Sequence, residues 1–184
     1  MTKLYIVHGF QADANSHWFP WLKRTLELEG HDVDVLNLPH PNQPNINEWL
    51  DYMRESVHKV DDNTIFVAHS LGVITTLKYL NDLDVNKVGG LAIVSGFKDK
   101  LEGLDILDEF VEQSIDYEKL KSKIIKKFGI ASKTDEIVPY TLTAELCDAL
   151  DAKFYLQNEG GHFCKEEGYD SFMFLKNKIL KYFD

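Results

Sequence analysis

The sequence predicts an α/β fold, a three-layer sandwich in which about six parallel strands form one sheet with helices on both faces. Short runs rich in apolar and β-branched residues alternate with longer segments whose apolar residues recur at helical spacing, a pattern typical of doubly wound parallel sheets. The run at residues 64–70 is continuously apolar before its last residues, as expected for a central strand covered on both faces. No repeat, low-complexity segment or linker interrupts the pattern, so a single domain over residues 1–184 is expected, and the segment 97–124 is short for a large lid.

Each expected element follows from its own residues. In chain order they are strand 3–9, helix 17–30, strand 33–39, helix 46–60, strand 64–70, helix 71–83, strand 88–96, helix 104–113, strand 124–132, helix 139–150, strand 152–158 and helix 169–183. The strands are short and rich in Val, Ile, Phe and Tyr, whereas the helices align apolar residues three and four positions apart. Gly30 ends the first helix, and Pro139 suits the first turn of the fifth.

Composition limits the classes of partner. The chain carries 20 Lys and Arg against 30 Asp and Glu, a formal net charge of −10, and this acidic balance argues against a nucleic-acid partner. No apolar run reaches the ~20 residues that cross a bilayer, so no membrane partner is expected. The first residues lack the apolar core and cleavage site of a signal peptide, and the two cysteines are therefore expected to be reduced thiols in the cytoplasm.

Ser70 lies where a predicted strand meets a predicted helix. A serine on a sharp strand-to-helix turn, with small residues two positions before and after it, is typical of a catalytic nucleophile. Ala68 and Gly72 are the small residues here, although the usual pattern has glycine at the first position. The alternative is a serine that caps the following helix.

Two further residues are expected to act with Ser70. A serine hydroxyl is a weak nucleophile until a histidine takes its proton and a carboxylate orients that histidine. Asp135 follows the fifth predicted strand, and His162 follows the sixth after a pair of glycines. The carboxyl ends of parallel strands share one edge of the sheet, so these side chains are expected to meet as a catalytic group. Glu136 is the rival carboxylate, and either acid alone would be an ordinary turn residue.

An oxyanion hole needs two backbone N–H groups beside the nucleophile. Leu71, which follows Ser70, is expected to supply one, and Phe10 the other, because Gly9 lets its loop approach closely; Gln11 is a possible side-chain contributor. His69 is expected to serve packing. Candidate substrate-binding residues are Gly9, His17, Trp18, Phe97 and Phe163, although aromatic residues also commonly fill cores.

No cofactor is implied by the sequence. It contains no H-E-x-x-H, paired C-x-x-C, G-x-G-x-x-G or P-loop pattern, so no metal, nucleotide or prosthetic group is expected. Cys164 lies two residues after His162, yet neither Cys147 nor Cys164 sits on a strand-to-helix turn. Both cysteines are therefore expected to be inert thiols.

Seven runs carry a resemblance to a known family: YIVHGF, HWFPWLK, LNLPHPNQP, VAHSLG, LAIVSGF, IASKTDEIVP and GGHF. They resemble the small serine hydrolases related to retinoblastoma-binding protein 9, especially the bacterial, YdeN-like branch, over nearly the whole chain. The resemblance implies an α/β-hydrolase fold with a triad of Ser70, Asp135 and His162. Neither cysteine has a leucine two positions before it, so the L-x-C-x-E motif of retinoblastoma-pocket ligands is absent and that binding activity is not expected.

The combined prediction is a serine hydrolase that acts on a small-molecule ester or amide. A carboxylesterase for small acyl esters is the first expectation, with an open site because the segment 97–124 is short for a deep lid. Two alternatives remain, which are an amide or peptide hydrolase and a binding module on a catalytically idle scaffold.

Overall fold

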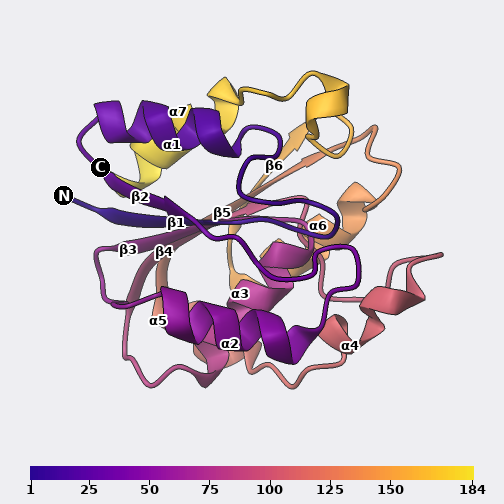
Figure 1. Ribbon diagram of the computed structural model, residues 1–184, viewed down its shortest axis with the longest axis horizontal. Coiled ribbons are helices and arrows are strands. Elements are labelled where there is room, and N and C mark those ends of the chain that lie inside the picture. The colour runs from indigo at the N-terminus through magenta and orange to yellow at the C-terminus, as the bar shows by residue number, and fades with distance from the viewer.

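The predicted α/β sandwich is confirmed by the computed structural model, which describes all 184 residues (Figure 1). Its six strands are β1 (Lys3–Val7), β2 (Asp32–Val35), β3 (Thr64–His69), β4 (Val88–Val94), β5 (Ile124–Ser132) and β6 (Lys153–Gln157). Its helices are α1 (Phe19–Leu28), α2 (Ile46–Ser56), α3 (Leu71–Asp82), α4 (Asp108–Val111), α5 (Tyr117–Lys123), α6 (Tyr140–Leu150) and α7 (Met173–Phe183). Two single 3-10 turns, η1 (Asp105–Leu107) and η2 (Lys165–Glu167), complete the elements.

The strand order brings the loops after β1 and β3 together. The sheet runs β2-β1-β3-β4-β5-β6, and every neighbouring pair is parallel. The chain passes from β1 to β2 on one side and from β3 to β4 on the other side. The loops after the adjacent strands β1 and β3 therefore start side by side and diverge along the sheet edge. In open parallel sheets, ligands bind at the carboxyl ends of the strands beside such a switch point.

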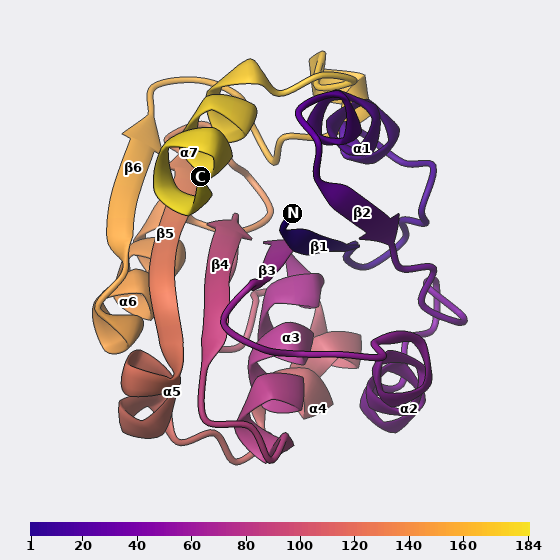
Figure 2. The ribbon, with the colours of Figure 1, turned by 90° about the vertical axis from the view of Figure 1, so that its left-hand side faces the viewer.

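Each face of the sheet buries its own apolar core (Figure 2). Helices α1 and α7 cover one face, where Phe19, Leu22 and Ile179 pack over β1, β3 and β5. Helices α2, α3, α5 and α6 cover the other face, where Trp49 and Leu146 are buried. Helices on both faces explain why the central strands β3 and β4 are buried along their whole length.

Three helical segments differ from the sequence prediction. The second helix ends at Ser56 rather than residue 60, because Val57 turns into an extended conformation and buries its side chain. The segment 104–113 forms η1 and α4 instead of one helix, and α5 was not predicted. The last helix, predicted over 169–183, begins only at Met173, which is 58% exposed, and buries Leu175. None of the helices has the combination of length and apolarity that crossing a bilayer requires.

Candidate active site

Ser70 is the single residue between β3 and α3, and its backbone is strained. Its φ of 54° and ψ of −122° lie in a region that residues with a side chain rarely adopt. The turn is tight because α3 starts against β1: a Cβ atom on Gly72 would lie 2.4 Å from the carbonyl oxygen of His8. Glycine is therefore required two positions after Ser70, as the sequence pattern anticipated.

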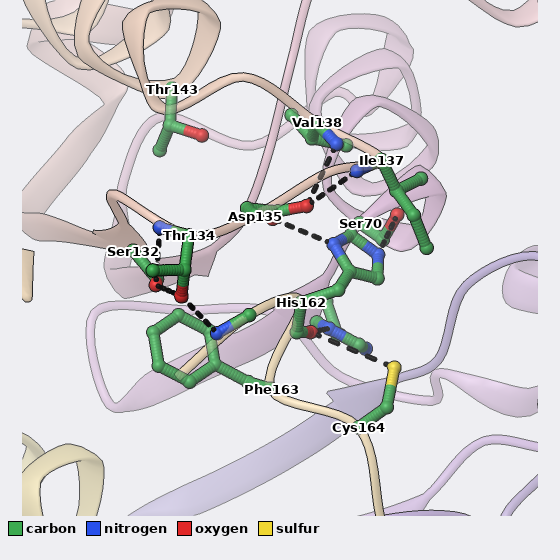
Figure 3. Close-up of polar contacts among 12 residues, drawn as sticks. Ser70, Ser132, Thr134, Asp135, Ile137, Val138, Thr143, His162, Phe163 and Cys164 are labelled. Carbon is green, nitrogen blue, oxygen red and sulfur yellow. Dashed lines mark hydrogen bonds and ion pairs between the residues drawn. The ribbon is translucent and has the colours of Figure 1, made fainter. Parts of the chain in front are cut away.

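A continuous hydrogen-bonded chain joins Ser70, His162 and Asp135 (Figure 3). The Oγ–H of Ser70 donates to Nε2 of His162 at 3.0 Å, and Nδ1–H of His162 donates to Oδ2 of Asp135 at 2.8 Å. The other carboxylate oxygen of Asp135 accepts the N–H groups of Ile137 and Val138, both at 2.9 Å. These bonds fix the tautomer of His162 that leaves Nε2 free to accept the serine proton.

The structure brings Asp135, and not Glu136, to His162. The Asp135 side chain is fully buried, whereas Glu136 is exposed on the same turn. Asp135 and His162 come from the carboxyl ends of neighbouring strands β5 and β6, and Ser70 comes from β3. All three side chains therefore lie at the edge of the sheet where the sequence predicts that they meet.

The loop after β1 packs directly against the Ser70 turn. A Cβ atom on Gly9 would lie 3.0 Å from Cβ of Ser70 and 3.3 Å from the backbone nitrogen of Leu71. The N–H of Phe10 donates to no other group of the protein, and Leu71 begins α3, so its N–H has no acceptor within the helix. Two free donors therefore lie on neighbouring backbone segments beside the serine.

Buried His8 holds this loop in place. Its Nδ1–H donates to the Gly9 carbonyl at 2.9 Å, and its Nε2 accepts the Leu38 N–H at 2.8 Å. Burial lowers the pKa of His8, which keeps the ring neutral and able to make both bonds. No local pattern indicates this role, because His8-Gly9 has the composition of a simple turn.

His69 does more than pack. Its Nε2–H donates to the carbonyl oxygen of His162 at 2.8 Å, so His69 helps to hold the backbone of His162 in place. Burial, reinforced by the neighbouring His162, lowers the pKa of His69 well below its usual range, and the ring is neutral. The sequence prediction for His69 missed this contact because it joins residues far apart in the chain.

These two neutral histidines predict a loss of stability in mild acid. A histidine whose pKa is lower in the folded state takes up its proton on unfolding, so stability is complete above about pH 6.5 and falls below it. The free energy of unfolding is therefore expected to decrease below that pH, by at most about 1.4 kcal/mol per pH unit for one such histidine. Urea denaturation between about pH 7.5 and 5.5, where carboxylates stay ionised, measures it; an unchanged free energy would contradict the assignment.

A cavity of about 270 Å³ opens beside Ser70 and His162, and both residues line it. Five of its lining side chains are apolar: Phe10, Leu101, Leu104, Leu107 and Ile137. The polar ones are Gln11, His17, Cys164 and Glu166. The three leucines belong to residues 101–107, which include η1. This short segment supplies an apolar wall of the cavity, where no large lid was expected.

Four of the five predicted substrate-binding residues do not line this cavity. Trp18, Phe97 and Phe163 are at most 1% exposed and belong to the two cores. Nε1–H of Trp18 donates to the carbonyl of Phe163 at 3.2 Å, which fixes both under the histidine loop. These three aromatic side chains fill the apolar cores rather than the cavity. Gly9 supports the Ser70 turn, and His17 alone of the five lines the cavity.

His17, Cys164 and Glu166 lie close enough to resemble a metal site, with their ligand atoms within 4.8 Å of one another. The Lys165 N–H donates to Nδ1 of His17 at 2.9 Å, which leaves the ring proton on Nε2. A ligating imidazole has the opposite arrangement, since it donates from the nitrogen that does not bind the metal. Burial and nearby acidic groups also raise the pKa of Cys164 to about 12, so its sulfur is a thiol. The tautomer of His17 and the protonated Cys164 sulfur therefore do not fit a resident cation at this cluster.

A parallel sheet with a serine at a strand-to-helix turn, and a histidine and a carboxylate on the same edge, defines the class of the α/β hydrolases. The structure agrees with the solved ydeN gene product of Bacillus subtilis at a TM-score of 0.96 and 39% identity, over 100% of this chain and 99% of that one. It also shares its fold with Est1E of Butyrivibrio proteoclasticus, at a TM-score of 0.74 and 13% identity over 98% and 89% of the chains.

The family follows from the sequence comparisons. The model of the serine hydrolase family matches residues 4–179, so the chain belongs to this family. It is 41% identical to the putative hydrolase YdeN of Bacillus subtilis, over 100% of this chain and 97% of that one. It is 28% identical to the serine hydrolase RBBP9 of Rattus norvegicus, over 97% and 96% of the two chains. The resemblance read from the sequence is confirmed, and the protein is a hydrolase.

Proposed function

We propose that this serine hydrolase is a carboxylesterase for small acyl esters, with Ser70, His162 and Asp135 as its catalytic triad. The observation that carries the proposal is the hydrogen-bonded chain from Asp135 through His162 to Ser70, which ends at the wall of a largely apolar cavity. In this proposal the strained turn at Ser70 is a nucleophile elbow that exposes Oγ to the substrate.

The reaction proceeds in two halves. Oγ of Ser70 bonds to the ester carbonyl carbon while Nε2 of His162 takes the hydroxyl proton, and Asp135 stabilises the resulting imidazolium. The bond to the alcohol oxygen then breaks, and His162 gives its proton to the departing alcohol. A water molecule, deprotonated by the same nitrogen, releases the acid and restores Ser70.

The N–H groups of Leu71 and Phe10 are proposed to bind the oxyanion that forms in each half. Both belong to backbone segments beside Ser70, and the lack of a side chain at Gly9 lets the two segments pack closely. Donors held in place before the reaction stabilise developing charge without reorganising, and a single one is commonly worth about 100- to 1,000-fold in turnover.

The size and lining of the cavity favour short aliphatic acyl groups. A volume of about 270 Å³ is below the range usual for drug-sized ligands, and Leu101, Leu104 and Leu107 offer an apolar surface. Glu166 at the same cavity and the net charge of −10 disfavour anionic acyl groups.

A series of p-nitrophenyl esters tests this specificity. We expect kcat/KM to be highest for short chains such as butanoate and to decrease towards dodecanoate. Leu104→Trp fills part of the cavity and is expected to move the preference towards acetate, about tenfold relative to butanoate, since one methylene in an apolar pocket is worth about 1–3 kcal/mol. Leu28→Trp, at a position 87% exposed on α1, is the matched control and keeps the original preference. Faster cleavage of long-chain esters, or of aminoacyl amides, would contradict the proposal.

A further inference from the structure

The loop that carries His162 has no regular secondary structure to hold it. It lies between β6 and η2, and its backbone is left-handed at Gly161 and at Phe163, where φ is 56° at both positions. For Phe163 this conformation is strained, because only glycine adopts it freely. Something other than a helix or strand must therefore keep the imidazole of His162 in reach of Ser70.

Side chains bond the backbone of this loop at four consecutive residues, 161–164. Oγ1 of Thr134 accepts the Gly161 N–H at 3.0 Å, and His69 and Trp18 donate to the carbonyls of His162 and Phe163. The bond to the N–H of His162 itself comes from Glu167. Its two carboxylate oxygens lie 2.9 and 3.0 Å from that nitrogen, and one of them lies 3.4 Å from the Cys164 nitrogen.

The fit between Glu167 and Gly161 is specific. A Cβ atom on Gly161 would lie 1.3 Å from Oε2 of Glu167, so the carboxylate occupies the space that any side chain there would need. Glu167 is fixed in turn, because its own N–H donates to the Cys164 carbonyl at 3.0 Å within the turn that η2 forms. Residues 162–167 therefore close into a small ring, with the carboxylate bonded to the amide of His162.

We infer that Glu167 is a positioning residue for His162: its carboxylate fixes the main chain from which the imidazole projects, and this requires the reach of the side chain, not its charge. The inference rests on the proposed catalytic role of His162. A hydrogen bond constrains both the distance and the direction of the groups it joins, and a displacement of about 1 Å at a catalytic group can cost ~100-fold in rate. Glu167 is not one of the residues that line the cavity and makes no hydrogen bond to Ser70, so we expect it to act through the backbone of His162.

Two substitutions separate reach from charge. Glu167→Gln keeps a carbonyl oxygen at the same reach and removes the charge, whereas Glu167→Asp keeps the charge and is one methylene too short. We expect Glu167→Gln to retain kcat within about threefold and Glu167→Asp to lose ~10- to 100-fold in kcat with little change in KM. Glu159→Gln, at an exposed glutamate of the same loop, is the control for a lost surface charge and keeps wild-type kcat.

The measurement is steady-state hydrolysis of p-nitrophenyl butanoate, with the melting temperature of each variant recorded alongside. Because Glu167 is exposed overall, neither substitution leaves a buried hole, and folded variants are expected. Wild-type kcat in Glu167→Asp, or an equal loss in Glu167→Gln and Glu167→Asp, would overturn the inference. Ser70→Ala in the same assay distinguishes the two levels of the account: if it stays active, the proposed function fails; if it is inactive while Glu167→Asp is unimpaired, only the inference about Glu167 fails.

Discussion

Replacing Ser70 with alanine is expected to lower ester turnover by about 10⁴-fold or more, because alanine lacks the hydroxyl oxygen that bonds to the substrate carbonyl carbon. The measurement is kcat/KM for a short p-nitrophenyl ester. Ser114→Ala, at an exposed serine that does not line the cavity, is the matched control and keeps full activity. Turnover by Ser70→Ala within tenfold of the wild type would show that another group performs the reaction.

Ser70→Gly adds a test of the strain at this position. Both replacements remove the hydroxyl, but only glycine adopts a φ of 54° and a ψ of −122° without steric cost. We expect Ser70→Gly to be as inactive as Ser70→Ala and more stable than it by about 1 kcal/mol or more. Thermal or urea denaturation compares them, and a less stable Ser70→Gly would mean that the turn stores no strain.

Asp135→Asn is expected to cost about 10⁴-fold in turnover while leaving the fold intact. The reason lies in the two bonds on the far oxygen of Asp135, which accepts the N–H groups of Ile137 and Val138. An asparagine must keep its carbonyl oxygen there to satisfy both donors, and its NH₂ group then points at Nδ1 of His162. That donor forces the ring proton onto Nε2, where it blocks acceptance of the Ser70 proton.

The adjacent carboxylate provides the control for this prediction. Glu136→Gln removes a charge one residue away but no bond to His162, so we expect turnover within about twofold of the wild type, as for surface substitutions in general. His162→Ala should be as inactive as Asp135→Asn, because either change leaves Ser70 without a base. Substantial activity in Asp135→Asn, or an equal loss in Glu136→Gln, would contradict the assigned role of Asp135.

The alternation of elements was readable from the sequence because local patterns determine it. Each strand began within one residue of its predicted start, and β5 matched its predicted range. The second helix was predicted too long because Val57 continues the apolar spacing, although it turns away from the helix. Helix α5 was missed because its apolar content is low and its start depends on a cap, in which the Asp116 side chain accepts the Lys119 N–H.

The candidate site could be predicted only in part, because local sequence patterns determine the strands but not the contacts between distant loops. The meeting of Ser70, Asp135 and His162 could be predicted because each follows a predicted strand, and the carboxyl ends of parallel strands share one edge. Trp18, Phe97 and Phe163 were misplaced because a core aromatic and a cavity aromatic have the same local sequence signature. The contacts of His69 and Glu167 with the His162 backbone depend on the conformation of one irregular loop, which no periodicity encodes.

Covalent labelling with a fluorophosphonate tests the central claim most directly, because such a probe reacts with an activated serine regardless of the natural substrate. Intact and peptide masses would be recorded for the wild type, Ser70→Ala and Asp135→Asn. The account predicts one adduct per chain, on Ser70, with none in Ser70→Ala and strongly slowed labelling in Asp135→Asn. No adduct on folded wild-type protein, or an adduct on another residue, would contradict it and would favour a binding module on a catalytically idle scaffold.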